Sequence, residues 1–293
     1  MKNYDVLIIG ASASGLMCAI EAGKRGRHVL VLDHANKVGK KILISGGGRC
    51  NFTNYNVSAE HYLSQNPHFC KSALSRFQYY DFLALMAEYD IPWHEKTLGE
   101  LLCDRSAGDI VQMLLAECKK HHVNIQLNST IDSVNRDILF QIETSKGCYS
   151  AQALVIATGG LSVSKMGATD LGLRLARQFN IPVVPTRPGL VPLIYNKKDS
   201  RRYKGLAGIS IESEITYNHQ IFKENILFTH KGISGPAVLQ ISSYWQAGEP
   251  IIINVLPELD LYLWLLEQQH IKANSLAKNV ISQLLPNRFA DRI

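Results

Sequence analysis

The first part of the chain alternates short apolar runs with a stretch of helical periodicity. Tyr4–Ile9 (YDVLII) and His28–Asp33 (HVLVLD) are almost continuously apolar, which is typical of strands buried on both faces of a sheet. Between them, Ala11–Gly26 carries apolar residues at helical spacing. Strand, glycine turn, helix and strand follow one another within about 30 residues, so the pattern predicts a βαβ unit with a right-handed crossover.

The middle of the chain predicts helices followed by strands. Tyr80–Tyr89 and Asp109–Lys120 are expected to be helices, and Asn124–Leu127 is expected to be a strand. Ile138–Glu143 predicts a strand in a hairpin that closes at Lys146-Gly147. The expected elements that follow are a buried strand, Ala153–Ala157 (ALVIA), and a helix, Asp170–Phe179.

The pattern changes after Ile181, where prolines at 182, 185, 188 and 192 break helices and mark a boundary. Residues 189–255 are rich in strands, with alternation over Ile209–Thr216 and a closing run at Ile251–Val255. After Pro257, helices are expected over Tyr262–Gln268 and Leu276–Leu285. We therefore expect an N-terminal domain at 1–186, a β-rich insert at 187–255 and a helical subdomain at 256–293.

The composition restricts the expected ligands and the expected location of the protein, but it does not identify a function. The 31 basic and 25 acidic residues give a net charge of +6, and the basic residues are spread along the sequence. This favours small anionic ligands, and we expect no nucleic acid as a partner. The six cysteines are scattered without a CxxC pair, so we expect reduced thiols and no metal site. No apolar run approaches the roughly 20 residues of a membrane span, and we expect a cytoplasmic protein.

The first candidate site is GASASG, Gly10 to Gly15, between the first strand and the first helix. Such a turn can serve packing alone, or it can bring a pyrophosphate to the helix N-terminus, where free N–H groups and the dipole stabilise it. Asp33, at the end of the second strand, is placed to bond ribose hydroxyls. Strand, turn, helix, strand and acid in this order indicate a nucleotide-binding unit.

The second candidate site is KVGKKILISGGGRCNFTN, residues 37–54. A flexible glycine loop would explain three consecutive glycines, but Lys40, Lys41 and Arg49 crowd positive charge there. We expect an extended segment that lies along a dinucleotide and a flat ring system. A flavin fits this expectation better than a nicotinamide, because the flavin ring needs polar partners along its edge.

Five segments carry a resemblance to a known family. IIGASASGLMCAIEAG, VGKKILISGGGRCNFTN, VIATGGLSVSKMGATDLG, LVPL and ILFTHKGISGPAVLQIS resemble, in order and spacing, the YhiN/BaiN-type flavoproteins. These are bacterial, aminoacetone oxidase-like FAD-dependent oxidoreductases of the two-dinucleotide-binding-domain superfamily. The resemblance implies an α/β, Rossmann-like FAD/NAD(P)-binding fold. It implies FAD binding by Gly10, Ser12, Ala13, Ser14, Gly15, Asp33, His34, Lys40, Lys41, Ser45, Gly46, Gly47, Gly48, Arg49, Cys50, Asn51, Ile131, Thr158, Gly159 and Gly160.

The sequence departs from the family pattern at three places. Ser12 stands where the dinucleotide turn usually has its middle glycine. SVSKMGATDLG, residues 162–172, differs from the usual S-x-P-x-x-G-S-T-G-x-G form. We also expect the chain to lack the family's C-terminal segment, whose second glycine-rich stretch covers the flavin.

No catalytic residue follows from the sequence, although two are weak candidates. His230, in FTHKGISGPAVLQIS, is a possible acid or base; the alternative is a structural turn with Ser234-Gly235-Pro236 as a helix cap. Cys50, beside the Arg49 cation, could have a lowered pKa and act as a redox thiol; the alternative is a small residue packed near the flavin.

We therefore expect an enzyme that transfers a hydride between a small-molecule substrate and bound FAD, with NAD(P)H as the reductant that the resemblance implies. One alternative is a nicotinamide-only dehydrogenase. A second is a non-catalytic remnant that binds nucleotide. The substrate and the oligomeric state do not follow from the sequence.

Overall fold

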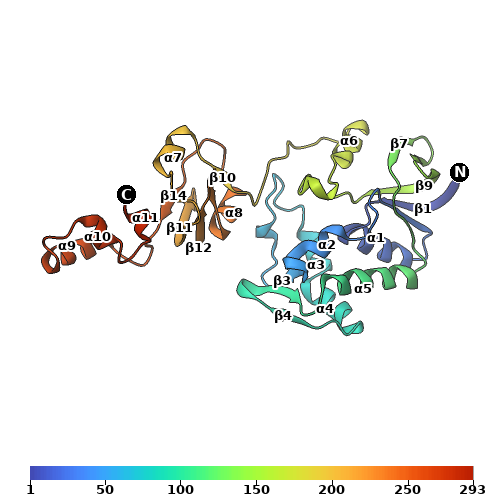
Figure 1. Cartoon of the computed structure of the whole chain (residues 1–293). Helices are drawn as coiled ribbons and strands as arrows, with labels where there is room; N and C mark the ends of the chain where they lie inside the picture. Colours follow the sequence, from blue (N-terminus) through green and yellow to red (C-terminus); the bar gives the residue numbers. More distant parts are fainter. Residues whose placement is uncertain (293) are drawn as a thin grey trace. The chain divides into compact units, whose positions relative to one another are not determined.

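A computed structural model describes residues 1–292 of the chain (Figure 1). The chain divides into two compact units, Met1–Val184 and Pro185–Ile293, called unit 1 and unit 2 below. Ile293, which ends the expected segment 256–293, lies outside the described residues. The separation of 187–255 and 256–293 into two domains stays a prediction.

Unit 1 is built on a six-stranded sheet in the order β6-β2-β1-β9-β8-β7. Its strands are β1 (Lys2–Ile9), β2 (Val29–Leu32), β6 (Asn124–Gln126), β7 (Ile131–Arg136), β8 (Phe140–Thr144) and β9 (Gly147–Ile156). β6, β2, β1 and β9 pair in parallel, whereas β8 and β7 are antiparallel. The expected βαβ unit and Rossmann-like α/β fold are confirmed.

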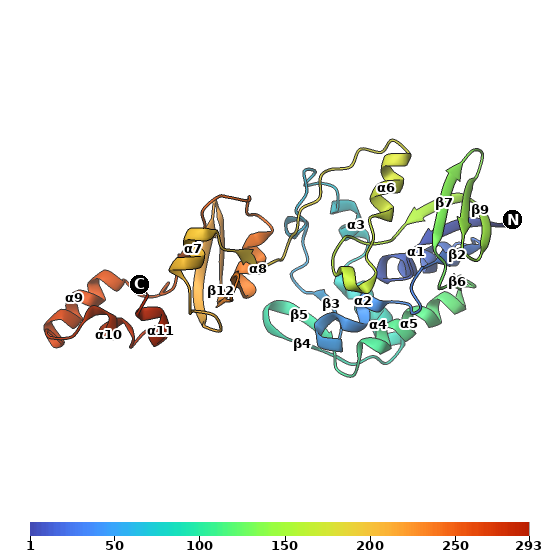
Figure 2. The same ribbon diagram turned by 45° about the horizontal axis from the view of Figure 1, so that its top comes forward.

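Strands β1 and β2 contain uninterrupted runs of apolar residues because both faces of this sheet are covered. Ile8 points into a core formed with α1 (Ala13–Lys24) and α5 (Ala107–Lys120). Its neighbours Leu7 and Ile9 point into a second core with β7, β8 and α6 (Leu171–Gln178). Figure 2 shows α1 and α5 on one side of the sheet, and β7 and α6 on the other. Alternate residues of one strand therefore serve two cores.

A smaller sheet in the order β3-β5-β4 completes unit 1. The remaining elements of this unit are β3 (Asn51–Asn54), β4 (Trp93–Glu95), β5 (Glu100–Cys103), α2 (Lys40–Ile44), α3 (Lys71–Arg76) and α4 (Tyr79–Glu88). α2 packs beside α5, and the segment after it leads directly into β3. The glycine-rich stretch thus connects α2 to the first strand of the smaller sheet.

Most expected elements of unit 1 form close to their expected limits, and the hairpin closes at Lys146-Gly147 as expected. The buried strand expected at Ala153–Ala157 is instead the end of β9, which starts at Gly147 and is only partly buried or exposed from Ala153 to Ile156. The sequence analysis missed β7. Only Val134 of that strand is buried, so its pattern gives almost no periodic signal. β7 forms because it pairs with β8, from Arg136 with Phe140 to Ile131 with Thr144.

Unit 2 contains a five-stranded sheet in the order β10-β13-β12-β11-β14. Its elements are β10 (Leu193–Ile194), α7 (Lys197–Arg202), β11 (Ser210–Tyr217), β12 (Gln220–Phe228), β13 (Gly232–Ser234), α8 (Pro236–Ser242), β14 (Ile252–Asn254), α9 (Leu261–Ile271), α10 (Ala277–Ile281) and α11 (Asn287–Ala290). The core under α8 includes Ile215 and Val238, and it is joined by Leu285, between α10 and α11, and by Phe289 on α11. No helix within residues 1–292 is long and apolar enough to cross a membrane.

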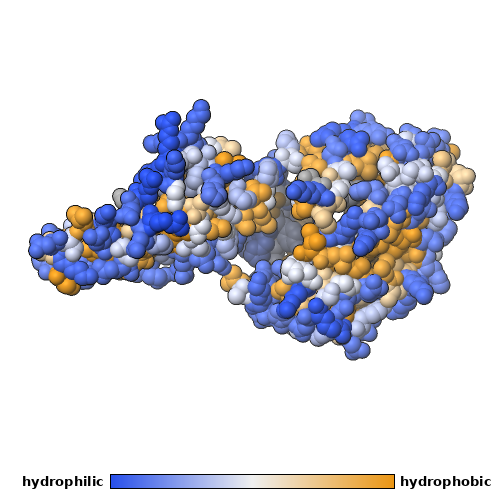
Figure 3. Space-filling view, in the orientation of Figure 1, coloured by the Kyte–Doolittle hydropathy of each residue, from blue (hydrophilic) through white to orange (hydrophobic). Residues whose placement is uncertain are grey.

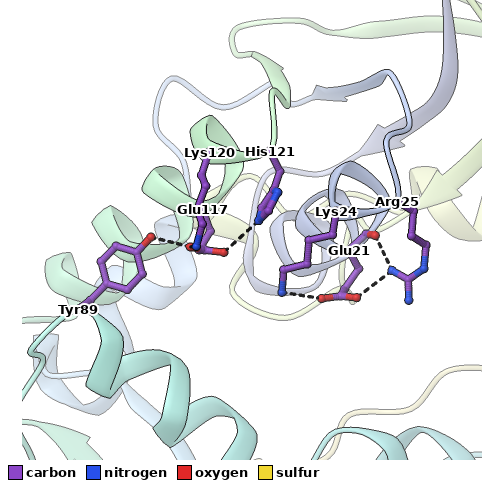
Figure 4. A network of polar contacts seen from close by, with 7 residues as sticks. All are labelled: Glu21, Lys24, Arg25, Tyr89, Glu117, Lys120 and His121. Atoms are coloured by element: carbon purple, nitrogen blue, oxygen red, sulfur yellow. Dashed lines mark hydrogen bonds and ion pairs between the residues drawn. The ribbon is translucent and has the colours of Figure 1, made fainter.

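A buried carboxylate ties α4 to α5 in unit 1 (Figure 4). Glu117 on α5 is only 1% exposed, and it accepts hydrogen bonds from Tyr89 Oη (2.7 Å) and Lys120 Nζ (2.9 Å). Burial alone raises the pKa of Glu117, but these hydrogen bonds outweigh burial and hold that pKa below its usual value. Tyr89 directly follows α4, so the contact fixes the end of that helix against α5.

Removing the Tyr89 hydroxyl tests this contact. We expect Tyr89→Phe to lower the free energy of unfolding at pH 7 by about 1.5 kcal/mol, because a charged acceptor loses a donor. The pKa of Glu117 is depressed in the folded state, so its contribution is complete above the unfolded pKa of about 4.3 and is lost as the pH falls through the folded value. The difference between wild type and variant should therefore shrink below about pH 4. Urea denaturation at several pH values measures it.

Tyr80→Phe is the matched control, because Tyr80 is 51% exposed. That variant should stay within about 0.5 kcal/mol of wild type. Equal losses in the two variants, or a loss at Tyr89 that persists unchanged in acid, would contradict the role given to Glu117.

Candidate functional site

The turn between β1 and α1 depends on two glycines. Gly10 has a φ of +117°, and a Cβ there would lie 2.3 Å from the carbonyl oxygen of Ala157 at the end of β9. A Cβ at Gly15 would lie 1.9 Å from the carbonyl oxygen of Gly10. Neither position admits a side chain. The turn therefore packs tightly against the sheet, and α1 starts directly above it.

The N-terminus of α1 is open to an anion. Ser12 is the N-cap residue, and its side chain makes no capping hydrogen bond. The first bond of the helix runs from Leu16 N–H to Ser12 O, so the N–H groups of the first turn lie ahead of the hydrogen-bonded ladder. Ala13 and Ser14 are exposed there. This arrangement suits a phosphate, and Ser12, the departure from the usual glycine, faces the adjoining pocket.

Asp33 holds the same turn against the end of β2. Its Oδ2 accepts a hydrogen bond from Ala11 N–H (2.7 Å), and its Oδ1 accepts one from Ala35 N–H (2.7 Å). The side chain is 14% exposed, so part of the carboxylate still faces outward. Each carboxylate oxygen has a second lone pair, so Asp33 can also accept a ligand hydroxyl.

A pocket of about 160 Å³ lies at the carboxyl ends of β1, β2 and β9. Such a position is where open α/β sheets bind their ligands. Six of the residues implied by the resemblance line it: Gly10, Ser12, Asp33, His34, Ile131 and Thr158. Sequence reasoning missed the other lining residues: Ile9, Leu32, Ser129, Thr130, Ala157, Gly167, Thr169, Leu171 and Arg174.

Some of these missed residues had a signal in the sequence. Ser129 and Thr130 follow β6, and the carboxyl ends of neighbouring parallel strands share one edge of a sheet. Gly167 falls in the segment 162–172 that differs from the family form, but only the fold places it beside His34 at the pocket. A Cβ on Gly167 would lie 2.8 Å from His34 Nε2. Arg174 on α6 is likewise placed by the fold, beside its ion-pair partner Asp170.

The SGGG stretch is compact, which corrects the expectation of an extended segment. Ser45–Gly48 forms a tight turn directly after α2, in which Gly46, Gly47 and Gly48 all have positive φ, a conformation that glycine adopts readily. A Cβ at Gly46 would lie 2.7 Å from Asn51 N, so chain packing explains this glycine. A Cβ at Gly47 would meet nothing within 4 Å. Gly47 therefore faces open space, where a ligand can approach the backbone.

Lys41 links this turn to the second glycine segment. Its Nζ donates to Ser162 Oγ (3.0 Å) and to Gly160 O (3.4 Å), across more than a hundred residues of sequence. Gly159 and Gly160 also face open space. Within residues 1–292, the cations implied by the resemblance, Lys40, Lys41 and Arg49, form no ion pair with a carboxylate. Their charge is thus available to an anionic ligand.

The two weak catalytic candidates are not brought together. Cys50 is 5% exposed in the core of unit 1, and burial raises the pKa of its thiol. The expectation of a lowered pKa is therefore wrong, because burial raises the pKa of this thiol by more than the Ser45 side chain lowers it. His230 belongs to unit 2 and is exposed in the turn between β12 and β13. The expected helix cap is confirmed there, with Gly235 as N-cap and Pro236 in the first turn of α8.

These residues fit FAD. The pocket can take an adenosine, the α1 N-terminus can take a pyrophosphate, and Gly47, Gly159 and Gly160 leave backbone open on the same unit. A Cβ at Gly47 or Gly159 would fill space that no part of residues 1–292 occupies. The site thus has the parts that a dinucleotide requires along its length.

Two curated relatives are similar to the whole chain. The chain is 50% identical over 295 residues to the ribosomal RNA dihydrouridine synthase of Escherichia coli (strain K12), with all of this chain and 74% of the relative covered. It is 44% identical over 298 residues to the protein of the same name from Haemophilus influenzae, with 99% and 74% covered. A 3-dehydro-bile acid delta(4,6)-reductase of Clostridium scindens is 28% identical over 269 residues, with 86% and 64% covered.

Solved structures share only part of the chain. A glycine oxidase from Geobacillus kaustophilus matches with a TM-score of 0.39 and 16% identity, covering 60% of this chain and 59% of that one. A steroid monooxygenase bound to NADP matches with a TM-score of 0.36 and 22% identity, covering 55% and 27%. At these scores the likeness adds nothing on function.

The family model described as the HI0933-like protein Rossmann domain matches residues 4–243. The matched region contains all of the residues that shape the pocket and the two glycine segments. The same region is also covered by the alignments with the two relatives, which extend along essentially the full chain. The chain therefore belongs to the HI0933-like family of flavin-dependent oxidoreductases, whose Rossmann domain binds FAD.

Proposed function

We propose that this enzyme reduces uridine in ribosomal RNA to dihydrouridine. The observation that carries the proposal is the 50% and 44% identity, along the whole chain, to two proteins named for that reaction. The more distant relative, a delta(4,6)-reductase, is also named for the removal of ring double bonds. Saturation of a ring carbon–carbon double bond is thus the chemistry that all three names share.

The reaction adds two hydrogens across one ring double bond, one as hydride and one as proton. When bound and reduced by NAD(P)H, its proposed electron source, FAD would supply the hydride, and solvent would supply the proton. The residues of this chain bind and orient the cofactor. Oxidation of a small amine such as aminoacetone is a weaker candidate, because the relatives are named for reductions. A nicotinamide-only dehydrogenase does not fit a family whose cofactor is FAD.

Each part of the site has a proposed task. The turn at Gly10–Gly15 and the first N–H groups of α1 hold the pyrophosphate. Asp33 and Ile131 hold the adenosine in the pocket, with the carboxylate accepting from ribose. The cations Lys40, Lys41 and Arg49 balance the phosphate charge. Gly47 and the turn Thr158–Gly160 let the rest of the cofactor approach the backbone.

An RNA substrate departs from the expectation that nucleic acid is not a partner. That expectation came from the even spread of basic residues along the sequence, and a fold can gather residues that the sequence scatters. The expected cytoplasmic location also stays a prediction.

Gly47→Ala tests the open glycine turn. The new methyl group would enter the space that the cofactor is proposed to occupy. We therefore expect the Kd for FAD to rise about tenfold, which is a loss of about 1.4 kcal/mol of binding free energy. Fluorescence titration of the FAD-free protein measures it. Alanine in the left-handed backbone conformation of Gly47 also costs about 1 kcal/mol of folding free energy, which thermal denaturation measures separately.

Gly26→Ala is the matched control. Gly26 has a φ of +70° against +66° at Gly47, it also faces open space, and it lies just after α1, at the far end from the proposed phosphate site. It should show the same loss of stability with an unchanged Kd. Unchanged FAD affinity in both variants would remove Gly47 from the proposed cofactor site.

The substrate is tested with ribosomal RNA from an Escherichia coli strain that lacks its own dihydrouridine synthase. We expect the purified protein with FAD and NADPH or NADH to form dihydrouridine, detected by mass spectrometry of the nucleosides as uridine heavier by two hydrogens. Heat-inactivated protein is the control. Flavin bands in the visible spectrum without dihydrouridine would contradict the RNA substrate. A protein that takes up no FAD would instead support the alternative of a non-catalytic remnant.

A further inference from the structure

Exposed basic side chains gather on α7 of unit 2. The helix and its flank read KKDSRRYK, and Lys197, Lys198, Arg201 and Arg202 are all exposed. Figure 3 shows hydrophilic side chains projecting from the surface over this helix. At i, i+1, i+4 and i+5, these four residues share one side of a short helix.

Another cation comes to α7 from a distant part of unit 2, and the backbone of a further basic residue lies close by. Lys231 precedes β13, and its carbonyl oxygen accepts from Tyr195 N–H (3.0 Å), two residues before the helix starts. Arg288 Nη1 donates to Gly205 O (3.2 Å), three residues after the helix ends. We call the four cations of α7 together with Arg288 the basic face: Lys197, Lys198, Arg201, Arg202 and Arg288. The fold thus concentrates charge that the sequence spreads over more than ninety residues.

The charge of the basic face is not neutralised within the part of the chain that the structure describes. Asp199, the acid on α7, accepts from Asn196 Nδ2 (2.7 Å) and forms no ion pair. Helices of unit 1 differ, since Arg25 pairs with Glu21 (2.8 Å) and Arg174 with Asp170 (2.9 Å). Ordinary solvated helix faces pair opposite charges in this way, whereas the four cations of α7 pair with no carboxylate within residues 1–292.

An aromatic pair supports one of the cations. The Arg202 guanidinium lies 5.5 Å from the centre of the Tyr203 ring, and Tyr203 packs against Tyr195 with ring centres 5.5 Å apart. Tyr203 also contacts Phe228 in the core of unit 2. Arg202 is therefore held by a ring that the core fixes, which lowers the entropy lost when it binds a ligand.

We propose that the basic face binds the sugar-phosphate backbone of the RNA substrate. This inference rests on the proposed function, because it assigns that substrate a docking surface on unit 2. Exposed Lys and Arg side chains bind phosphates and release counterions, and backbone contacts position a nucleic acid without reading its sequence. The basic face supplies such contacts, because its positively charged side chains are exposed and are held together by a folded unit.

The test is the salt dependence of RNA binding by the full chain. Fluorescently labelled fragments of Escherichia coli ribosomal RNA are titrated at several KCl concentrations by fluorescence anisotropy. In the triple variant Lys198→Gln, Arg201→Gln and Arg202→Gln, the slope of log affinity against log salt should become shallower by about 2 units, at about 0.7 per phosphate contact. Affinity at low salt should fall at least about tenfold. Glutamine keeps helix propensity close to that of Lys and Arg, so α7 should still form.

The matched control is Arg27→Gln, Lys71→Gln and Lys119→Gln in unit 1. The three side chains are exposed and form no ion pair within residues 1–292. Their replacement by glutamine removes the same net charge as the triple variant in α7. The control should keep the wild-type slope. Equal changes in the two triple variants, or none in the α7 variant, would overturn the proposal.

Dihydrouridine formation by wild type, measured in parallel, separates this inference from the proposed function. Wild type that forms dihydrouridine, together with an α7 variant that binds RNA normally, would overturn the docking surface alone. Wild type that neither binds the fragments nor forms dihydrouridine would overturn both.

Discussion

The geometry of the candidate site depends on the carboxylate of Asp33. One of its oxygens binds the N–H of Ala11 in the glycine turn, and the other binds the N–H of Ala35 beyond β2, both at 2.7 Å. The turn that starts α1 is thereby fastened to the end of the neighbouring strand. Because Gly10 and Gly15 leave no room for movement against β9, the helix N-terminus has one position relative to the sheet. The pocket lies where these constraints meet.

The glycines of the site fall into two groups with different causes. Gly10, Gly15 and Gly46 are required by the protein itself, because a Cβ at each would strike backbone atoms within 3 Å. Gly47 and Gly159 have positive φ but face open space, so packing does not account for them. The first group shapes the site, and the second leaves backbone accessible from outside. A run such as SGGG therefore combines both roles within three residues.

Much of unit 1 was predictable because its signals are local. Continuous apolar runs gave β1, β2 and the end of β9, and the order of turn and acid gave Gly10–Gly15 with Asp33. The failures have a common physical origin in contacts distant along the chain. β7 forms through its pairing with β8, and burial in the core raises the pKa of Cys50 although the cation Arg49 is its neighbour in sequence. Gly167 lines the pocket beside His34, a contact between residues far apart in the chain that no local pattern indicates.

The central claim is that Asp33 fixes the adenosine end of an FAD site. Asp33→Ala and Asp5→Ala test it as a pair, because Asp5 binds His28 N–H (2.8 Å) at the opposite end of the same two strands. The measurement is the Kd for FAD of each FAD-free variant, determined by fluorescence titration. The account predicts a rise of at least about tenfold for Asp33→Ala and no change for Asp5→Ala. Equal FAD affinity in the two variants would contradict it.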